Sequence, residues 1–315
     1  MNGIKIRGMG HAVPSHAASN VDIAQVVDTS DEWILTRTGI RERRYCTEET
    51  SVQLGVEAAE KAIAVSGISP DEIGVCIVAT LSPDRMIPAT ACMVQKEIGL
   101  EEDTLCYDLS AACSGFLFAL HTTECLLNAC PKKYGLVIGA EVLSRLLDWT
   151  DRGTCILFGD GAGAAVVECG EGWPSIGAIS GSRGDVEALY VEGPGSEERS
   201  YIRMDGKKVF RFAVETIPKC MDQVLEKTGR TLDEIDFFVF HQANVRIIDH
   251  AVRKYHIPKE KYYMNIDRYG NTSAASIPLV LSELQEQGKV HSGSRVMLIG
   301  FGGGLTWGGA VIEFA

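Results

Sequence analysis

Two stretches with the same pattern decide the fold: "AIAVSGISPDEIGVCIVAT" at residues 62–80 and "VLEKTGRTLDEIDFFVFHQ" at residues 224–242. Each is typical of a helix that ends at a glycine, followed three residues later by Asp-Glu-Ile and then by an apolar strand. The same residues can also recur independently, because they suit any junction between a helix and a strand. This pair alone therefore suggests an internal duplication without establishing it.

Two more pairs recur in the same order along the chain. "KKYGLVIGAE" (132–141) is similar to "GSRVMLIGFG" (293–302), and "FGDGAGAAVVE" (158–168) is similar to "FGGGLTWGGAVIE" (301–313). Three weak matches in one order favour a duplication over repeated local chemistry.

Both halves alternate helices with short, continuously apolar strands such as "VCIVAT" and "FFVFH". Strands of this kind are typical of sheets that are buried on both faces, so we predict an α/β fold with layered helices and sheets. We place the first half over residues 1–172 and the second over residues 173–315. The segment 177–208 is rich in Gly, Ser and charge, and we expect it to be a loop that covers a site.

Charge and composition exclude several classes of protein. The 315 residues carry a net charge of −12, which disfavours a nonspecific nucleic-acid binder. No apolar run reaches the ~18 residues of a membrane helix, and the N-terminal sequence does not resemble a signal peptide. Ten cysteines without a secretion signal suggest reduced thiols and a cytoplasmic protein. No C-x-x-C pair is present, so we expect no metal site.

One cysteine has an unusual setting. The stretch "TLCYDLSAACSGFLFALHTTECLL" (104–127) predicts a short strand, a turn of small residues and a buried helix. Cys113 lies at the N-terminus of that helix, where unpaired N–H groups and the helix dipole favour negative charge, so we expect a lowered thiol pKa and a nucleophile. Free cysteines are more often small buried residues, and we interpret six others in this way: Cys76, Cys92, Cys106, Cys125, Cys155 and Cys169.

A nucleophilic cysteine needs partners, and the repeat indicates where to look for them. His241 ends the strand "FFVFH" in the register of Ala79, but a histidine there could equally cap the strand or satisfy a core hydrogen bond. Asn271 in "YGNTSAAS" stands 158 residues after Cys113, close to the 162 that separate Gly67 from Gly229. By itself an asparagine is more often a turn residue.

A glycine loop, "GFGGGL" (300–305), follows the strand "RVMLI". Backbone N–H groups in such loops can bind a developing oxyanion. The loop lacks the G-K-[ST] and G-x-G-x-x-G patterns of phosphate-binding motifs.

Cys113, His241 and Asn271, in this order and these contexts, resemble the β-ketoacyl-acyl carrier protein synthase III family. The resemblance implies a duplicated thiolase-like fold with a five-layered α-β-α-β-α core. Elongating ketosynthases carry a second histidine at the place of Asn271, and thiolases carry a second cysteine near the C-terminus, which this chain lacks after Cys220. The resemblance covers nearly the whole chain, and six motifs carry it: "DEWILTRTGIRER" (31–43), "AACSGF" (111–116), "DWTDRGTCILFGDGAGA" (148–164), "HQANVRII" (241–248), "YGNTSAAS" (269–276) and "FGGGLTWG" (301–308).

The resemblance implies the initiating condensation of type II fatty-acid synthesis. Cys113 takes the acyl group of an acyl-CoA, and decarboxylation of malonyl-acyl carrier protein then gives the carbanion that attacks it. His241 and Asn271 would donate hydrogen bonds to the enolate, and the N–H groups of Cys113 and Gly303 would hold the oxyanion. Acyl-CoA is a substrate, and no permanently bound cofactor is expected.

The resemblance also assigns residues to the coenzyme A substrate. Trp33 and Arg152 would sandwich the adenine, while Thr29 and Arg37 bind the nucleotide. The pantetheine tunnel would be lined by Asn244, Phe210 and Gly206. We interpret the neighbouring Arg43 and Arg44 as parts of a solvated surface.

An acyl carrier protein is acidic, so an enzyme of net charge −12 must offer it a local basic patch. Arg246, Arg253 and Lys254 are spaced so that they share one face of the helix after His241. Arg211, with Lys207 and Lys208, extends this patch. Such residues often serve only solubility.

Relatives are homodimers in which a loop of one subunit closes the acyl pocket of the other. The matching loop here is "SPDRMIPATAC" (82–92), with Ile87 at its tip. Acetyl and short branched primers both remain possible with a side chain of this size.

Three other functions stay open as alternatives. A specialised ketosynthase-like acyltransferase of secondary metabolism often alters the His/Asn pair or the docking face, and this chain keeps both. A silent thiolase-fold subunit loses the nucleophile, which is present here. A redox protein uses paired cysteines, which are absent from this sequence.

Overall fold

The computed structural model describes residues 1–193 and 200–315. Its strands are β1 (Ile4–Ala12), β2 (Ala17–Ser19), β3 (Glu42–Arg44), β4 (Ile73–Ala79), β5 (Leu105–Leu109), β6 (Tyr134–Glu141), β7 (Gly161–Cys169), β8 (Ile179–Ser182), β9 (Leu189–Tyr190), β10 (Arg203–Met204), β11 (Phe237–Phe240), β12 (Arg295–Gly302) and β13 (Thr306–Phe314). Its α-helices are α1 (Asn20–Ala24), α2 (Asp31–Thr38), α3 (Ser51–Ser66), α4 (Thr90–Ile98), α5 (Gly115–Leu127), α6 (Arg152–Cys155), α7 (Gly206–Thr228), α8 (Val245–Lys254), α9 (Ile266–Tyr269) and α10 (Ser276–Glu286). Short 3₁₀ turns are η1 (Pro70–Glu72), η2 (Ala112–Ser114), η3 (Leu143–Leu146), η4 (Leu232–Glu234), η5 (Lys259–Lys261) and η6 (Ser273–Ala275).

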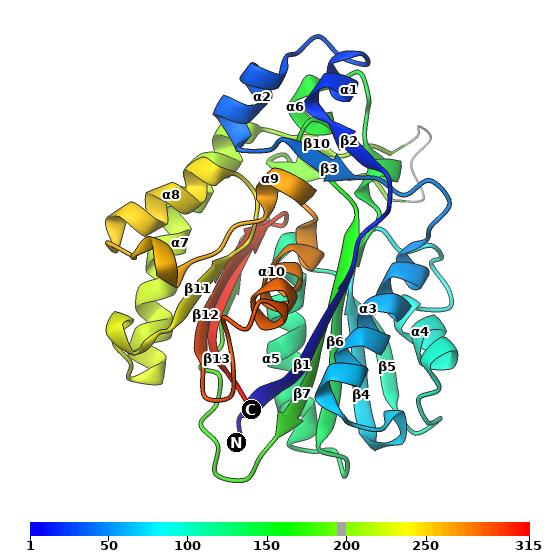
Figure 1. Cartoon of the computed structure of the whole chain (residues 1–315), viewed down its shortest axis with the longest axis vertical. Helices are drawn as coiled ribbons and strands as arrows, with labels where there is room; N and C mark the ends of the chain where they lie inside the picture. The colour runs from blue at the N-terminus through cyan, green and yellow to red at the C-terminus, as the bar shows by residue number, and fades with distance from the viewer. Residues whose placement is uncertain (194–199) are drawn as a thin grey trace.

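The helices and strands form five layers (Figure 1). Helices α5 and α10 lie in the middle, and each contacts strands on both sides. The main sheet has the order β11-β12-β13-β1-β7-β6-β4-β5, with β8 paired to β13. Among the described residues, its two parts are joined through β1 and β13, which pair at Lys5↔Glu313 and Ile6↔Phe314. Helices α3 and α4 cover one outer face, and α7 and α8 cover the other, which gives the five-layered α/β architecture expected from the sequence.

The burial of each layer follows from its residues. Strands β4 and β6 are buried along their whole length, as their continuous apolar sequences predict. The central helix α10 is buried from Ser276 to Leu284, because strands flank it on two sides. A helix that is apolar nearly all round is stable only inside a protein, so α5 and α10 define the centre of the molecule.

The repeated motif has a common local structure. Gly67 ends α3 and Gly229 ends α7, each with a left-handed backbone of φ 67° and 64° that glycine adopts without strain. A 3₁₀ turn follows in both places, η1 and η4, and leads to a buried strand. This chemistry explains why glycine and Asp-Glu-Ile recur at the same spacing. The boundary between residues 172 and 173 stays a prediction.

Two sequence interpretations are wrong. Arg43 is fully buried, because it is the central residue of the short strand β3 and points inward. Its guanidinium donates to Asn20 Oδ1 at 2.9 Å and to the carbonyl of Ile156 at 2.6 Å, so it serves the interior and not a solvated surface. Cys125, expected inside an apolar run, is exposed on α5.

The segment 177–208 is more ordered than a loop. Its described residues include β8, the antiparallel pair of β9 and β10, and the first residues of α7. Residues 194–199 of this segment lie outside the described residues. Within residues 1–193 and 200–315, no helix combines the length and apolarity that a membrane crossing requires.

Candidate active site

Cys113 lies at the floor of a cavity of about 780 Å³. It belongs to η2, which passes directly into α5, as the strand-turn-helix pattern predicts. The preceding Ala112 has a φ of 46°, a rare value for a residue with a Cβ. Backbone strain of this kind often marks a functional turn. The Cys113 side chain faces the cavity, although only 5% of the residue is exposed.

The expected lowering of the thiol pKa is wrong for this structure. Burial, which outweighs the lowering by the Ser273 hydroxyl and is reinforced by the Glu141 carboxylate, raises the pKa of Cys113 to about 12. The loss of hydration outweighs the favourable field at a helix N-terminus, because an unsolvated anion is costly. The resting thiol is therefore protonated and must lose its proton before it can attack.

The second half places a matching turn opposite Cys113. This turn, η6, passes directly into α10 and packs against η2. Its first residue, Ser273, has a φ of 49°, nearly the value of Ala112. Asn271, one predicted partner of Cys113, bonds to this turn, and His241, the other, bonds to the first residue of α10.

His241 follows β11 and is almost fully buried. Its Nδ1 lies 2.6 Å from Ser276 Oγ at the start of α10. A serine hydroxyl that donates to Nδ1 leaves the imidazole proton on Nε2. Burial lowers the pKa of His241 to about 3, so the imidazole is neutral at physiological pH. The arrangement suits a neutral Nε2–H donor.

Asn271 is fixed by its backbone and by its side chain. Its N–H donates to the carbonyl of Leu157 at 2.8 Å, and its carbonyl accepts from Gly159 N at 3.0 Å. Its Oδ1 accepts from Ser273 N at 2.9 Å. Because the amide oxygen is occupied by this bond, the Nδ2 group is the donor that remains for a ligand.

Gly303 follows β12 and lines the same cavity as Cys113. Thr306, a residue without a role in the sequence analysis, connects this loop to the cysteine turn. Its hydroxyl lies 3.1 Å from the carbonyl oxygen of Ala111 and 3.0 Å from that of Gly303. A polar residue that links two distant segments has no local sequence signal, which explains why it was missed.

Glycine is required where the strands touch these turns. A Cβ on Gly302 would lie 2.7 Å from Cys113 N, and one on Gly139 would lie 2.3 Å from the carbonyl oxygen of Ala274. Both distances are shorter than any normal van der Waals contact. Strand β12 thus supports the cysteine turn, and strand β6 supports η6.

The residues expected to bind the nucleotide of coenzyme A gather around α2. The guanidinium groups of Arg37 and Arg152 lie 4.4 and 4.6 Å from the centre of the Trp33 ring. Asn244 caps α8 and donates to the carbonyl of Arg37 at 3.0 Å, which ties α8 to α2. Thr29 precedes α2, and its buried Oγ1 has no hydrogen-bond partner.

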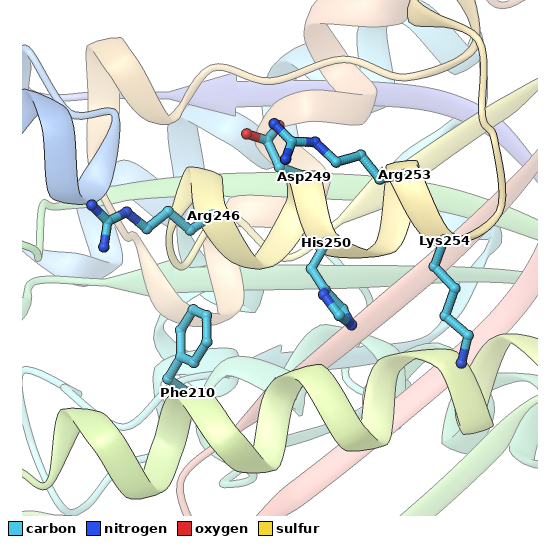
Figure 2. A pocket seen from close by; sticks show the side chains of 6 residues that line it. All are labelled: Phe210, Arg246, Asp249, His250, Arg253 and Lys254. Atoms are coloured by element: carbon cyan, nitrogen blue, oxygen red, sulfur yellow. The ribbon is translucent and has the colours of Figure 1, made fainter.

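Three of the four predicted docking residues, Arg246, Arg253 and Lys254, line a groove between α7 and α8 of about 470 Å³ (Figure 2). Phe210, expected in the pantetheine tunnel, is 40% exposed and faces this groove from α7. Arg246 also donates to the carbonyl of Thr36 at 3.1 Å. Arg211 and Gly206 lie on α7 outside the lining of the groove. The complete lining is Phe210, Arg246, Asp249, His250, Arg253 and Lys254.

The loop at residues 82–92 has two sides. Arg85 and Met86 line the cavity above Cys113. Ile87 is 87% exposed and does not line that cavity, so it is available for contact with another chain. Among the described residues, no three His, Cys, Asp or Glu side chains form a group that could hold a metal ion.

The chain is similar to known proteins in sequence and in fold. Residues 107–184 match the family model of 3-oxoacyl-[acyl-carrier-protein (ACP)] synthase III, and residues 225–314 match its C-terminal model. The chain is 45% identical to a β-ketoacyl-[acyl-carrier-protein] synthase III of Clostridium acetobutylicum, over 100% of this chain and 99% of the relative.

Two solved structures extend the comparison. The 3-oxoacyl-[acyl-carrier-protein] synthase III of Aquifex aeolicus VF5 has 43% identity and a TM-score of 0.92, over 99% of this chain and 100% of that one. The priming β-ketosynthase of the R1128 polyketide pathway has 34% identity and a TM-score of 0.94, over 99% and 96%. The chain belongs to the β-ketoacyl-acyl carrier protein synthase III family.

Proposed function

We propose that this condensing enzyme carries out the initiating step of type II fatty-acid synthesis. It would join an acyl-CoA primer to malonyl-acyl carrier protein and release CoA, CO₂ and β-ketoacyl-acyl carrier protein. The observation that supports the proposal is the packing of η2 against η6. The first turn carries the Cys113 thiol that lines the cavity, and the second is followed by Ser276, which bonds to the neutral His241, and contains Ser273, which orients the Asn271 amide.

The first half-reaction uses Cys113. Its thiolate attacks the carbonyl carbon of the acyl-CoA, and the C–S bond to coenzyme A then breaks. The negative oxygen of the tetrahedral intermediate would accept from the N–H groups of Cys113 and Gly303, which border the same cavity. Storing the acyl group on the enzyme divides one difficult condensation into two steps.

The second half-reaction uses His241 and Asn271. Loss of CO₂ from the malonyl group leaves an enolate whose oxygen needs hydrogen-bond donors. A neutral imidazole Nε2–H and an amide Nδ2–H can both donate, whereas a carboxylate at either place would repel the enolate. The resulting carbanion attacks the acyl-Cys113 thioester and frees the thiolate.

The substrates would bind at two of the surfaces described above. The adenine of the primer would stack on Trp33 next to Arg152, with Arg37 and Thr29 close to the nucleotide. The acidic carrier protein would dock at the groove of Arg246, Arg253 and Lys254, with Arg211 on α7 adding to the basic surface, while Asn244, Phe210 and Gly206 would line the path of the pantetheine arm.

A second copy of the chain would complete the acyl pocket. Ile87 is exposed and does not line its own cavity, which supports a homodimer in which this side chain enters the partner's pocket. We assign the reaction to the cytoplasm, because all ten cysteines are free thiols. No resident cofactor takes part in either half-reaction.

Intact mass spectrometry tests the proposal. The enzyme is mixed separately with acetyl-CoA, isobutyryl-CoA and longer acyl-CoAs, and malonyl-acyl carrier protein is then added. We expect a covalent acyl adduct with at least one primer, and its discharge as β-ketoacyl-acyl carrier protein. An adduct that the malonyl carrier cannot discharge would favour the specialised acyltransferase of secondary metabolism, and no adduct with any primer would contradict both functions. The exposed thiol variant Cys125→Ala serves as the control and should load normally.

A further inference from the structure

A buried carboxylate on the central helix α10 has no part in the mechanism described above. Glu283 is only 5% exposed. Its Oε1 accepts from the Tyr269 hydroxyl at 2.9 Å. Its Oε2 accepts from Asn265 Nδ2 and from Arg268 Nη2, each at 2.9 Å. Three donors therefore converge on one side chain, and a carboxylate, with two acceptor oxygens, can serve all of them.

All three donors belong to the segment that leads to Asn271. Asn265 is the N-cap residue of α9, and its side chain reaches Glu283 rather than the backbone of α9. Tyr269 is the last residue of α9. The next residue, Gly270, has φ 63° and ψ −154°, a conformation that is essentially limited to glycine. Asn271 follows, so only one residue separates it from a side chain that is bonded to Glu283.

The same segment is tied to His241 through the neighbouring Gln242. Gln242 is 1% exposed, and its Oε1 accepts from Asn265 N at 3.2 Å. Its Nε2 donates to the last carbonyl of β11 at 2.8 Å. Ser276, the first residue of α10, bonds to His241 Nδ1. Helix α10 is therefore linked to the histidine at its start and to the asparagine segment through Glu283.

Two donors on different segments can serve one enolate oxygen only if the distance between them is fixed. Helix α10 can fix it, because it is buried and contacts strands on both sides. Neither Glu283 nor Tyr269 lines the cavity that contains Cys113, so both can affect the reaction only through other residues.

We propose that Glu283 is a positioning residue that sets the place of Asn271 Nδ2 relative to His241 Nε2 during decarboxylation. The proposal rests on the proposed function, because it concerns the enolate formed from malonyl-acyl carrier protein. The carboxylate holds Asn265 at one end of α9 and Tyr269 at the other. When these bonds are lost, the two enolate donors shift relative to each other. The backbone N–H donors of the loading step lie on other segments and keep their places.

Glu283→Gln is the first test. The glutamine amide has a single acceptor oxygen, so it keeps the size of the side chain and loses at least one of the three bonds. We expect decarboxylation by the acylated enzyme to slow by about 10²-fold, the cost of a misplacement of about 1 Å. The loss should lie in kcat and not in KM for the malonyl carrier. Loading by acetyl-CoA should stay within about threefold, as measured by single-turnover kinetics.

A double-variant cycle separates positioning from a general loss of structure. Tyr269→Phe removes one bond to Glu283 and keeps the ring, so it also serves if Glu283→Gln does not fold. It should slow decarboxylation by about tenfold on its own, but by less than about twofold once Asn271→Ala has removed the amide. An equal effect in both backgrounds would show that Tyr269 does not act through Asn271, and would overturn the proposal.

Hydrogen exchange tests the geometry without any substrate. The Ser273 N–H donates to Asn271 Oδ1 at 2.9 Å, so its exchange rate reports the orientation of that amide. Glu283→Gln and Tyr269→Phe should each speed this exchange by about tenfold or more, while peptides from β4 keep their rates. Mass spectrometry with residue resolution measures both. Unchanged exchange at Ser273 would overturn the positioning role whatever reaction the enzyme catalyses.

Glu124 on α5, the other central helix, provides the matched control. It is 1% exposed, and its carboxylate accepts from Ser175 Oγ and from Ile176 N, each at 2.9 Å, away from the segments of the two enolate donors. Glu124→Gln should lower the thermal unfolding midpoint but leave the ratio of decarboxylation to loading unchanged. If it reduced that ratio as strongly as Glu283→Gln, burial of a carboxylate would explain the effect, and the positioning role would be wrong.

Loss of the proposed function and loss of the positioning role would give different results. An unmodified enzyme that takes up no acyl group would contradict the proposed function, while the exchange rates in η6 would still decide the role of Glu283. An active enzyme whose Glu283→Gln variant loses loading and decarboxylation equally would contradict the positioning role, because an equal loss indicates a general change of structure.

Discussion

The two turns at the centre of the molecule have almost the same backbone and different chemistry. In the first half, Ala112 with φ 46° leads through η2 into α5; in the second, Ser273 with φ 49° leads through η6 into α10. The next residue is Cys113 in one turn and Ala274 in the other. The duplicated fold thus offers two equivalent positions, and only one of them carries a nucleophile.

The two different turns can form one active site because each turn packs against a strand of the other half. Strand β12 of the second half contacts η2, and strand β6 of the first half contacts η6. The turn without a thiol holds the polar groups instead: Asn271 bonds to Ser273, and His241 bonds to Ser276. Each half therefore supplies what the other lacks, and one active site results from two similar turns.

The largest effect should come from making the first turn chemically like the second. Cys113→Ala places the residue type of position 274 on η2 and removes the nucleophile, so no acyl adduct should form with any primer. Intact mass after incubation with acyl-CoA measures this directly. An adduct of normal extent on the variant would show that another thiol carries the acyl group.

The next effect should come from removing a donor held by the second turn. His241→Ala and Asn271→Ala should each slow decarboxylation of malonyl-acyl carrier protein by about 10²–10³-fold, the cost of one oxyanion donor. Loading of Cys113 should stay within about threefold, because the donors of that step are backbone N–H groups. Single-turnover loading and CO₂ release separate the two steps, and equal damage to both would contradict the division of roles.

Backbone contact between the halves can be broken with one methyl group. Gly302→Ala would place a Cβ 2.9 Å from the Cβ of Cys113, and Gly139→Ala would place one against Ala274. We expect each to cost about 1–3 kcal/mol of unfolding free energy, the usual cost of overpacking. Gly302→Ala should slow loading more than Gly139→Ala does. Thermal unfolding measures the stability cost, and single-turnover loading measures the loading defect. A larger loading defect in Gly139→Ala would contradict the assignment of β12, rather than β6, as the strand that supports the cysteine turn.

A smaller effect is expected on the outer layer of the second half. Arg253→Glu adds a negative charge to the groove between α7 and α8, and should raise KM for malonyl-acyl carrier protein by about tenfold through lost attraction and added repulsion. Acyl-CoA loading should stay nearly intact. Arg246→Glu should act in the same way, with an added effect on α2 because Arg246 bonds to Thr36.

Lys96→Glu on α4 is the matched charge reversal in the outer layer of the first half. It should leave KM for malonyl-acyl carrier protein unchanged. The oligomeric states of Lys96→Glu and Arg253→Glu are compared first, so that a change in assembly is not mistaken for a change in docking. An equal rise in KM for Lys96→Glu would show that net charge, and not the groove, attracts the carrier.

A separate effect, on stability and without a change in the chemistry of the turns, concerns Glu141, which ends β6 and is fully buried. The carboxyl pKa is raised from about 4.5 in the unfolded chain to about 7 in the fold, so the folded state keeps its proton where the unfolded state has lost it. Stability is then lost as pH rises from about 4.5 to 7. Glu141→Gln lacks this titration. The unfolding free energy of the variant, relative to that of the unmodified protein, should therefore increase by up to about 3 kcal/mol as pH rises over this range. Urea unfolding at pH 5 and pH 8 measures the difference; a pH-independent difference would contradict the assignment.

Local patterns predicted much of this molecule. The repeated glycine, Asp-Glu-Ile and apolar strand are local chemistry, and they indicated the layered α/β fold before any contact was known. The position of Cys113 at the start of a buried helix was predictable for the same reason. Its pKa was not, because desolvation depends on how completely β12 and η6 cover the thiol.

Other features depend on distant contacts. Arg43 looks like a surface residue in a basic run, and its burial follows only from the pairing of β2 with β3. Ser273 and Thr306 come from different segments that meet in the fold, so no spacing along the chain could associate them with Cys113.

The central claim is that one thiol, seated between the two turns, is loaded by an acyl-CoA and emptied by a malonyl carrier. The most direct measurement is a time course of intact mass for the unmodified enzyme, with acyl-CoA first and malonyl-acyl carrier protein second. The account predicts an adduct of one acyl group per chain, mapped to Cys113, that disappears as β-ketoacyl-acyl carrier protein forms. An adduct on a different residue, or one that persists after the malonyl carrier is added, would contradict it.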